Sequence, residues 1–161
     1  MPAPSNSTLD HREPLGLAAA CVRRGDFEAA LGHLKTLLES DPRHEIATGM
    51  LAGVYAQLKM PERAEYFYLQ VLRLNSANVL ARFQLGLLQL QSGRPQDALE
   101  TWQPTLADSQ DYLTQFHSAL ALLELKRAAE ARKLLEQAAH HMPRSHPLYP
   151  QLVSLRDQLS S

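Results

Sequence analysis

The chain has 161 residues, of which 45% are hydrophobic and 20% charged, a composition typical of a folded globular protein with one well-buried core. Its 16 Lys and Arg against 17 Asp and Glu leave a net charge of −1, and no run of like charge favours a nucleic-acid partner. No segment has the roughly 18 uncharged apolar residues that span a membrane, so we expect no membrane insertion.

The N-terminal residues, MPAPSNSTLDHREP, contain no apolar run of the kind that a secretory signal needs. We therefore expect residues 1–10 to form a short disordered tail and the protein to be cytoplasmic. Cys21 is the only cysteine, which excludes an internal disulfide and suits a reducing compartment.

The rest of the chain repeats one pattern four times. Alanines recur at 30, 64, 98 and 131, so the spacing is 34, 34 and 33 residues. A bulky apolar residue follows each alanine by four places, and a small residue, of the kind that allows two helices to cross closely, precedes it by twelve. The bulky residues are Leu34, Tyr68, Trp102 and Leu135, and the small ones are Ala18, Ala52, Gly86 and Ala119.

Local signals predict two helices in each repeat. Apolar residues follow helical spacing in LGLLQLQSG and ALETW, and strand-like alternation is absent. Gly25 and Gly93 lie where a first helix should end, and Pro61 and Pro95 lie where a second helix should begin. In the other two repeats, Lys59 and Lys126 replace the glycine, which should weaken those turns only slightly. The predicted helix pairs are residues 11–44, 45–78, 79–111 and 112–145.

Two features follow from the last two repeats. Pro104 falls about nine residues into the second helix of the third pair, where it removes a backbone hydrogen bond, so this helix should end early or kink. Residues 146–161 should form a capping helix, because the last repeat of an array otherwise leaves an apolar face in water. Its apolar side is Leu148, Leu152, Leu155 and Leu159.

This pattern resembles the tetratricopeptide repeat (TPR) over residues 11–145. The resemblance implies an all-α fold, a right-handed superhelical solenoid of antiparallel helix pairs with about four repeats and a C-terminal cap. The proline that ends the family pattern is present as Pro42 and Pro143, whereas Ser76 and Gln110 stand in its place in the other two repeats.

The resemblance also implies a peptide-binding groove, because in this family the first helix of each repeat lines the concave face. The residues carried over by position are all apolar or glycine, which favours an amphipathic helix or an apolar peptide as ligand. In the alternative interpretation, packing within the array hides part of this stripe. The groove residues are Leu15, Ala19, Val22, Gly49, Gly53, Ala56, Phe83, Leu87, Leu90, Phe116, Leu120 and Leu123.

Three details of this groove matter for function. Phe83 and Phe116 hold equivalent places and should present two rings to a partner. Gly49 and Gly53 lie one turn apart, which indicates that either a neighbouring helix or a ligand needs the space. Some members of the family bind a C-terminal carboxylate with a clamp of lysines, asparagines and an arginine, and the resemblance implies that this chain cannot form one. The matching residues are Leu15, Ala19, Met50, Leu80 and Gln84, or, if the clamp starts one repeat later, Gly49, Gly53, Gln84, Leu113 and His117.

No catalytic, metal or cofactor site is predicted. Cys21 holds the place of Tyr55 in the next repeat, a core position, and a buried thiol without a cationic neighbour is inert. Adjacent histidines on a helix, such as His140 and His141, should point away from each other, and with His146 they form no ligand set. Tyr68 and Trp102 are at the core position, so we expect them and Phe67 to pack inside rather than to form a stacking platform.

The sequence therefore predicts a non-enzymatic module that binds another protein or peptide, and it leaves homo-oligomerisation open. A more specific alternative is a cytoplasmic chaperone, because the short array and apolar groove resemble the small TPR chaperones that hold translocator subunits of bacterial type III secretion. A third hypothesis, an enzyme, would need a site that no motif reveals.

Overall fold

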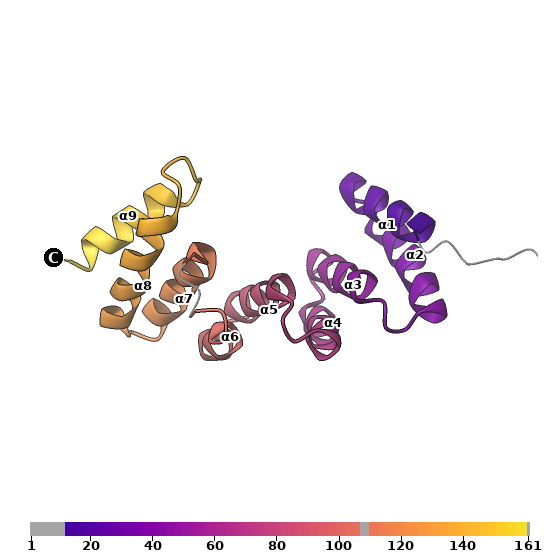
Figure 1. Cartoon of the computed structure of the whole chain (residues 1–161), viewed down its shortest axis with the longest axis horizontal. Helices are drawn as coiled ribbons and strands as arrows, with labels where there is room; N and C mark the ends of the chain where they lie inside the picture. Colours follow the sequence, from indigo (N-terminus) through magenta and orange to yellow (C-terminus); the bar gives the residue numbers. More distant parts are fainter. Residues whose placement is uncertain (1–11, 107–109, 161) are drawn as a thin grey trace, which may run out of the picture. The chain divides into compact units, whose positions relative to one another are not determined.

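The computed structural model describes residues 12–106 and 110–160, and in these residues every regular element is an α-helix. The predicted all-α class is thus confirmed for the described part of the chain, while the predicted tail, residues 1–10, lies outside it. The helices are α1 (Arg12–Arg24), α2 (Phe27–Ser40), α3 (Glu45–Gln57), α4 (Pro61–Leu74), α5 (Val79–Gln91), α6 (Pro95–Trp102), α7 (Tyr112–Glu124), α8 (Ala128–His141) and α9 (Tyr149–Gln158) (Figure 1).

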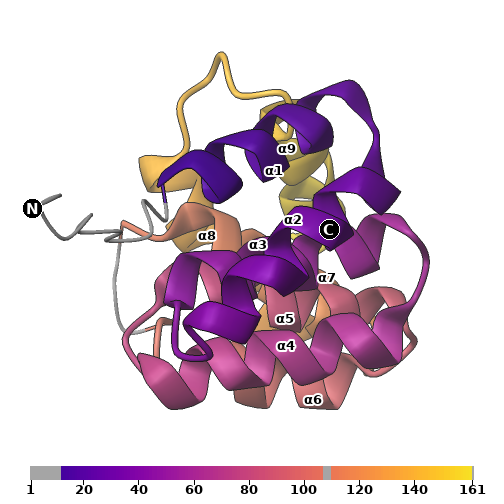
Figure 2. The same ribbon diagram turned by 90° about the vertical axis from the view of Figure 1, so that its right-hand side faces the viewer.

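The chain divides into two compact units, Met1–Ala77 and Asn78–Ser161. In the first unit α1 packs against α2 and α3 against α4, and α2 also contacts α3. Figure 2 shows α3 lying alongside α4. In the second unit the pairs are α5 with α6 and α7 with α8, and α9 packs on α8. Each unit is therefore built from two consecutive helix pairs, as the repeat predicts.

Short polar side chains and prolines set where the helices begin. At the start of α2, Asp26 Oδ1 accepts a hydrogen bond from the Ala29 N–H at 3.2 Å, which satisfies one of the free donors of the first turn. Pro61 and Pro95 are the first residues of α4 and α6, as predicted, because a proline there lacks only a donor that would be unpaired anyway. The same capping bond is made at α3, α5 and α7 by His44, Asn78 and Asp111.

The same type of turn joins the two helices of every pair. In each, a residue with left-handed backbone ends the first helix, and the next N–H donates to the carbonyl five positions earlier at 2.8 to 3.0 Å. This geometry suits glycine, which has no Cβ to clash. The left-handed residues are Gly25 (φ 76°), Lys59 (φ 58°), Gly93 (φ 71°) and Lys126 (φ 59°).

Lys59→Gly and Lys126→Gly are each expected to raise the free energy of unfolding by up to about 1 kcal/mol. A side chain in the left-handed region costs roughly 1–2 kcal/mol, and the greater freedom of glycine in the unfolded chain offsets part of the gain. Both lysine side chains are exposed, so no contact is lost. Urea denaturation measures the effect, with Gly93→Ala as the reverse control, which should lose stability. If both lysine variants were less stable than the wild type, the turn assignment would be wrong.

The repeated small and bulky residues form the core, as the period predicts. The marker alanines 30, 64, 98 and 131 are fully buried, and so are Leu34, Trp102 and Leu135, with Tyr68 nearly so. Ala18, Ala52 and Ala119 are also fully buried, which confirms that small residues occupy the helix crossings. The core position of Tyr68 and Trp102 is thereby confirmed, while Phe67 is half-buried.

Pro104 shortens the second helix of the third pair. Helix α6 ends at Trp102 after 8 residues, whereas α2, α4 and α8 each have 14. Without an N–H, Pro104 cannot bond to the carbonyl of Glu100, and its ring would clash there if the helix continued. The N–H of Thr105 instead turns back to the carbonyl of Trp102 at 2.8 Å. The predicted early end is confirmed.

Helix α9 covers the apolar side of the last pair. Leu152 is fully buried in a cluster with Phe116, Leu135 and Met142, and the other three leucines of this helix side, including Leu148, are partly buried against it. The predicted capping helix therefore shields side chains that α7 and α8 alone would leave in water.

Candidate functional site

In the first unit, the sequence-predicted groove residues lie on one face of α1 and one face of α3. Leu15, Ala19 and Val22 on α1 are half-buried. On α3, a Cβ added to Gly49 would meet Val71 Cγ2 at 3.7 Å, and one added to Gly53 would meet Tyr68 Oη at 3.8 Å. These are ordinary contact distances with side chains of α4, so both positions have room for an alanine and packing against α4 does not require glycine at either one.

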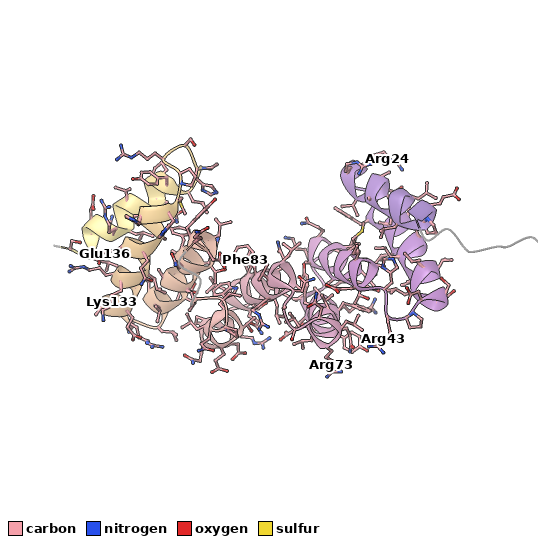
Figure 3. All side chains as sticks on the ribbon, viewed as in Figure 1. Arg24, Arg43, Arg73, Phe83, Lys133 and Glu136 are labelled. Carbon is pink, nitrogen blue, oxygen red and sulfur yellow. The ribbon has the colours of Figure 1, made fainter. Side chains whose placement is uncertain are left out.

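In the second unit, the predicted residues lie on α5 and α7. Phe83, Leu87 and Leu90 follow one face of α5, and Figure 3 shows Phe83 beside α7. All three are half-buried, and the two leucines pack against the buried cluster of Ala98, Trp102 and Ala121. Leu120 and Leu123 of α7 are likewise half-buried against the cluster under α9. This apolar face, Phe83, Leu87, Leu90, Leu120 and Leu123, is called the α5–α7 face below.

Phe116 does not belong to this face. Its side chain is 1% exposed and lies in the cluster with Leu135, Met142 and Leu152. The expectation that it presents a ring to a partner is therefore wrong for this structure. The physical reason is the capping helix, because apolar side chains of α7, α8 and α9 form one buried cluster and this ring is part of it. The alternative, that packing within the array hides part of the stripe, holds at this position.

The ring of Phe83 belongs to a cluster built from three helices. Its centroid lies 6.3 Å from that of Trp102 on α6 and 5.6 Å from that of His117 on α7, and the Trp102 and His117 centroids are 6.4 Å apart. The indole Nε1 of Trp102 donates to the backbone oxygen of Phe83 at 3.2 Å. The hydrogen bond fixes the backbone at Phe83, and the two ring contacts hold its side chain in place.

The structure adds exposed apolar residues that the carried-over positions omit. Leu80, near the start of α5, is 66% exposed and lies one turn before Phe83, and Val79 next to it is also exposed. In the first unit, Ile46 near the start of α3 is 61% exposed and holds the equivalent place one repeat earlier. The 34-residue spacing between Ile46 and Leu80 is the signal that identifies this position from sequence.

The thiol and the histidines differ in part from expectation. Cys21 is buried, as predicted, but Arg24 Nη2 donates to its sulfur at 3.5 Å, so the assumption that it has no cationic neighbour is wrong. The rings of His140 and His141 do not point apart, because their centroids lie 4.9 Å from each other with the rings edge to face.

Within residues 12–106 and 110–160, no group of three potential metal ligands comes together, and no helix is long and apolar enough to cross a membrane.

The chain matches no curated protein, but solved structures share its fold. MamA 41-end from Desulfovibrio magneticus RS-1 is 18% identical over 93% of this chain and 89% of its own, with a TM-score of 0.79. YrrB, described as a TPR protein with an unusual peptide-binding site, is 18% identical over 93% and 76%, with a TM-score of 0.78. PilW, described as a widely conserved type IV pilus biogenesis factor, is 20% identical over 96% and 72%, with a TM-score of 0.79.

These likenesses confirm the predicted fold class, a solenoid of adjacent helix pairs. A model of the tetratricopeptide repeat family matches residues 15–79 and 83–150, which together make up most of the chain. The chain therefore belongs to the tetratricopeptide repeat family.

Proposed function

We propose that this protein is a non-enzymatic binding module that takes an amphipathic helix or an apolar peptide segment of another protein on the α5–α7 face. The observation that carries the proposal is the chemistry of this face, which has aromatic and leucine side chains, half-buried, and no charged residue at its five positions. Apolar faces of this kind accept the i, i+3, i+4 and i+7 side chains of an amphipathic helix.

Membership of the TPR family supports a protein-binding role, and the description of YrrB as having a peptide-binding site supports a peptide as ligand. Phe83 is the best candidate for an anchor, because aromatic side chains held rigidly at the centre of an interface commonly contribute most of its binding energy. Leu80, one turn earlier on α5 and exposed, extends the apolar surface beyond Phe83.

Phe83→Ala is expected to weaken binding of the partner by about 2 kcal/mol, or roughly 30-fold in Kd, because it removes the aromatic anchor. The matched control is Tyr66→Ala, which removes a 57% exposed ring from α4 and should leave affinity unchanged. A partner captured from a native extract is titrated against each variant, while circular dichroism verifies that helix content is retained. Phe116→Ala is unsuitable here, because removing a buried ring costs roughly 3–5 kcal/mol of stability.

If Tyr66→Ala weakened binding and Phe83→Ala did not, the interaction would lie elsewhere and the proposed face would be wrong. The chaperone alternative is separated by the identity of the captured protein. A secreted protein with long apolar segments would favour it, whereas an ordinary soluble partner would favour a general binding module. Turnover of a substrate by the purified chain would contradict the non-enzymatic assignment.

A further inference from the structure

His117 lies among aromatic rings from three helices of the second unit. Its imidazole contacts the rings of Phe83 on α5, Trp102 on α6 and its own neighbour Phe116 on α7, with centroid distances of 5.6, 6.4 and 5.3 Å. The imidazole is half-buried, and these three contacts are with aromatic rings, which carry no formal charge to offset one on the imidazole. Figure 1 shows the three helices that meet here, α5, α6 and α7.

The cluster is special to this junction. The place of His117 is held in the earlier repeats by Gly16, Met50 and Gln84, none of which can be protonated. The junction is also the one that follows α6, the shortest helix of the described chain, with 8 residues. The contact of Trp102 with His117 joins α6 to α7, beside the packing of Ala98 and Trp102 with Ala121.

We propose that protonation of His117 opens this ring cluster and loosens α7 from the α5–α6 pair, so that the second unit has a closed form at neutral pH and a loosened form in mild acid. Because His117 is half-buried, an imidazolium has to give up part of its hydration to stay between phenylalanine and tryptophan rings, and moving α7 away restores that hydration. The proposal concerns the free chain and holds whether or not the α5–α7 face binds a peptide.

The charged groups of the packed helices do not favour the protonated ring. Burial lowers the pKa of His117, and no carboxylate acts to raise it. On α5, the guanidinium of Arg82 donates to the Thr101 carbonyl at 3.4 Å. The carboxylates of α6 and α8 that could stabilise a positive charge on the imidazole are paired on the surface instead. The pairs are Asp97 with Arg94, Glu100 with Gln96, Glu130 with Arg127 and Glu136 with Arg132. Glu124, at the end of α7, is exposed.

The direction of the pH effect follows from the lowered pKa. Well above pH 6.5, the ordinary pKa of histidine, the imidazole is neutral in both folded and unfolded chains and the closed form is fully stable. As the pH falls through 6.5 toward the lower pKa of the closed form, the open form takes up the proton more readily and its population rises. Each unit by which the closed-form pKa lies below that of the open form shifts the opening equilibrium about tenfold.

Trp102 is the only tryptophan and is fully buried, so its fluorescence reports on the cluster. Titration of the full chain from pH 7.5 to 5 is expected to shift its emission to the red, with a midpoint below about 6.5, while far-ultraviolet circular dichroism keeps the helical signal. His117→Gln introduces the residue type found at the equivalent position 84 and should abolish the red shift of the emission. His140→Gln, an exposed histidine of α8, should titrate like the wild type.

Amide hydrogen exchange gives a second measurement. At pH 5.5, exchange in α7 of the wild type should be faster than in His117→Gln at the same pH, and exchange in α3 should be the same in both. If the glutamine variant does not fold, His117→Met, which introduces the residue type found at position 50, takes its place. The pKa of His117 can also be measured in the wild type from its proton resonances, which requires no variant. An unshifted emission in the wild type, a red shift that persists in the His117 variants, or a His117 pKa at or above 6.5 would each overturn the proposal.

Discussion

Changing both Leu152 and Leu155 to serine is expected to lower the free energy of unfolding by about 4 kcal/mol and to make unfolding less cooperative. Leu152 is fully buried among the side chains of α7 and α8, and truncating a buried leucine typically costs about 2–5 kcal/mol. Leu155 is partly buried against the same cluster and adds less. The loss is a large share of the roughly 5–15 kcal/mol by which a domain is stable.

Guanidinium denaturation followed by circular dichroism measures this effect, and loss of cooperativity appears as a shallower transition. The matched control changes Val79 and Leu80 to serine, which alters two apolar residues of the same unit that are exposed. Exposed substitutions usually change stability by no more than about 0.5 kcal/mol each. An unchanged transition in the Leu152 and Leu155 double variant would show that α9 does not stabilise the fourth helix pair.

Replacing Gly86 by alanine is expected to lower the free energy of unfolding by about 2–3 kcal/mol, although alanine is the better helix former. A Cβ at this position would lie within 3.0 Å of three ring atoms of Trp102, a distance that real Cβ atoms essentially never show. The indole is fully buried and held by its hydrogen bond to Phe83, so it cannot move aside freely. Thermal and urea denaturation measure the change.

The other repeats show how the size of the small residue depends on that of its bulky partner. Alanine stands at the small position where the bulky partner is leucine or tyrosine, as in Ala18 with Leu34 and Ala119 with Leu135, and only the tryptophan repeat has glycine. Trp102→Leu should therefore relieve the effect of Gly86→Ala. In a double-mutant cycle the combined loss should be smaller than the sum of the single losses by at least about 1 kcal/mol.

Gly53→Ala is the matched control for this cycle. It also adds a methyl group to a first helix, but at an ordinary contact distance of 3.8 Å from Tyr68 Oη, so it should stabilise the chain by about 0.5–1 kcal/mol. Equal effects of the two glycine substitutions would contradict the steric explanation for Gly86.

The candidate site was predicted from sequence only in outline. The repeat period identified which helices carry the apolar stripe, because equivalent places recur every 33 or 34 residues. It could not separate Phe116 from Phe83, since both hold the same place in the repeat. Burial distinguishes them, and burial depends on the neighbour: Phe116 is covered by the cluster that includes Leu152 of α9, whereas Phe83 is half-exposed beside His117.

The sequence by itself determined the helix pairs, their turns, the early end of α6 and the core alanines. These features depend on local chemistry: capping side chains, the fixed φ of proline, left-handed turn positions and the period of small and bulky residues. Only the tertiary structure decided which side chains of the apolar stripe are buried, that the Trp102 ring leaves no room for a Cβ at Gly86, and that the ring of His117 contacts that of Trp102. Such contacts join residues of different helices, and a contact of this kind depends on the size and position of both partners rather than on either one's place in the repeat.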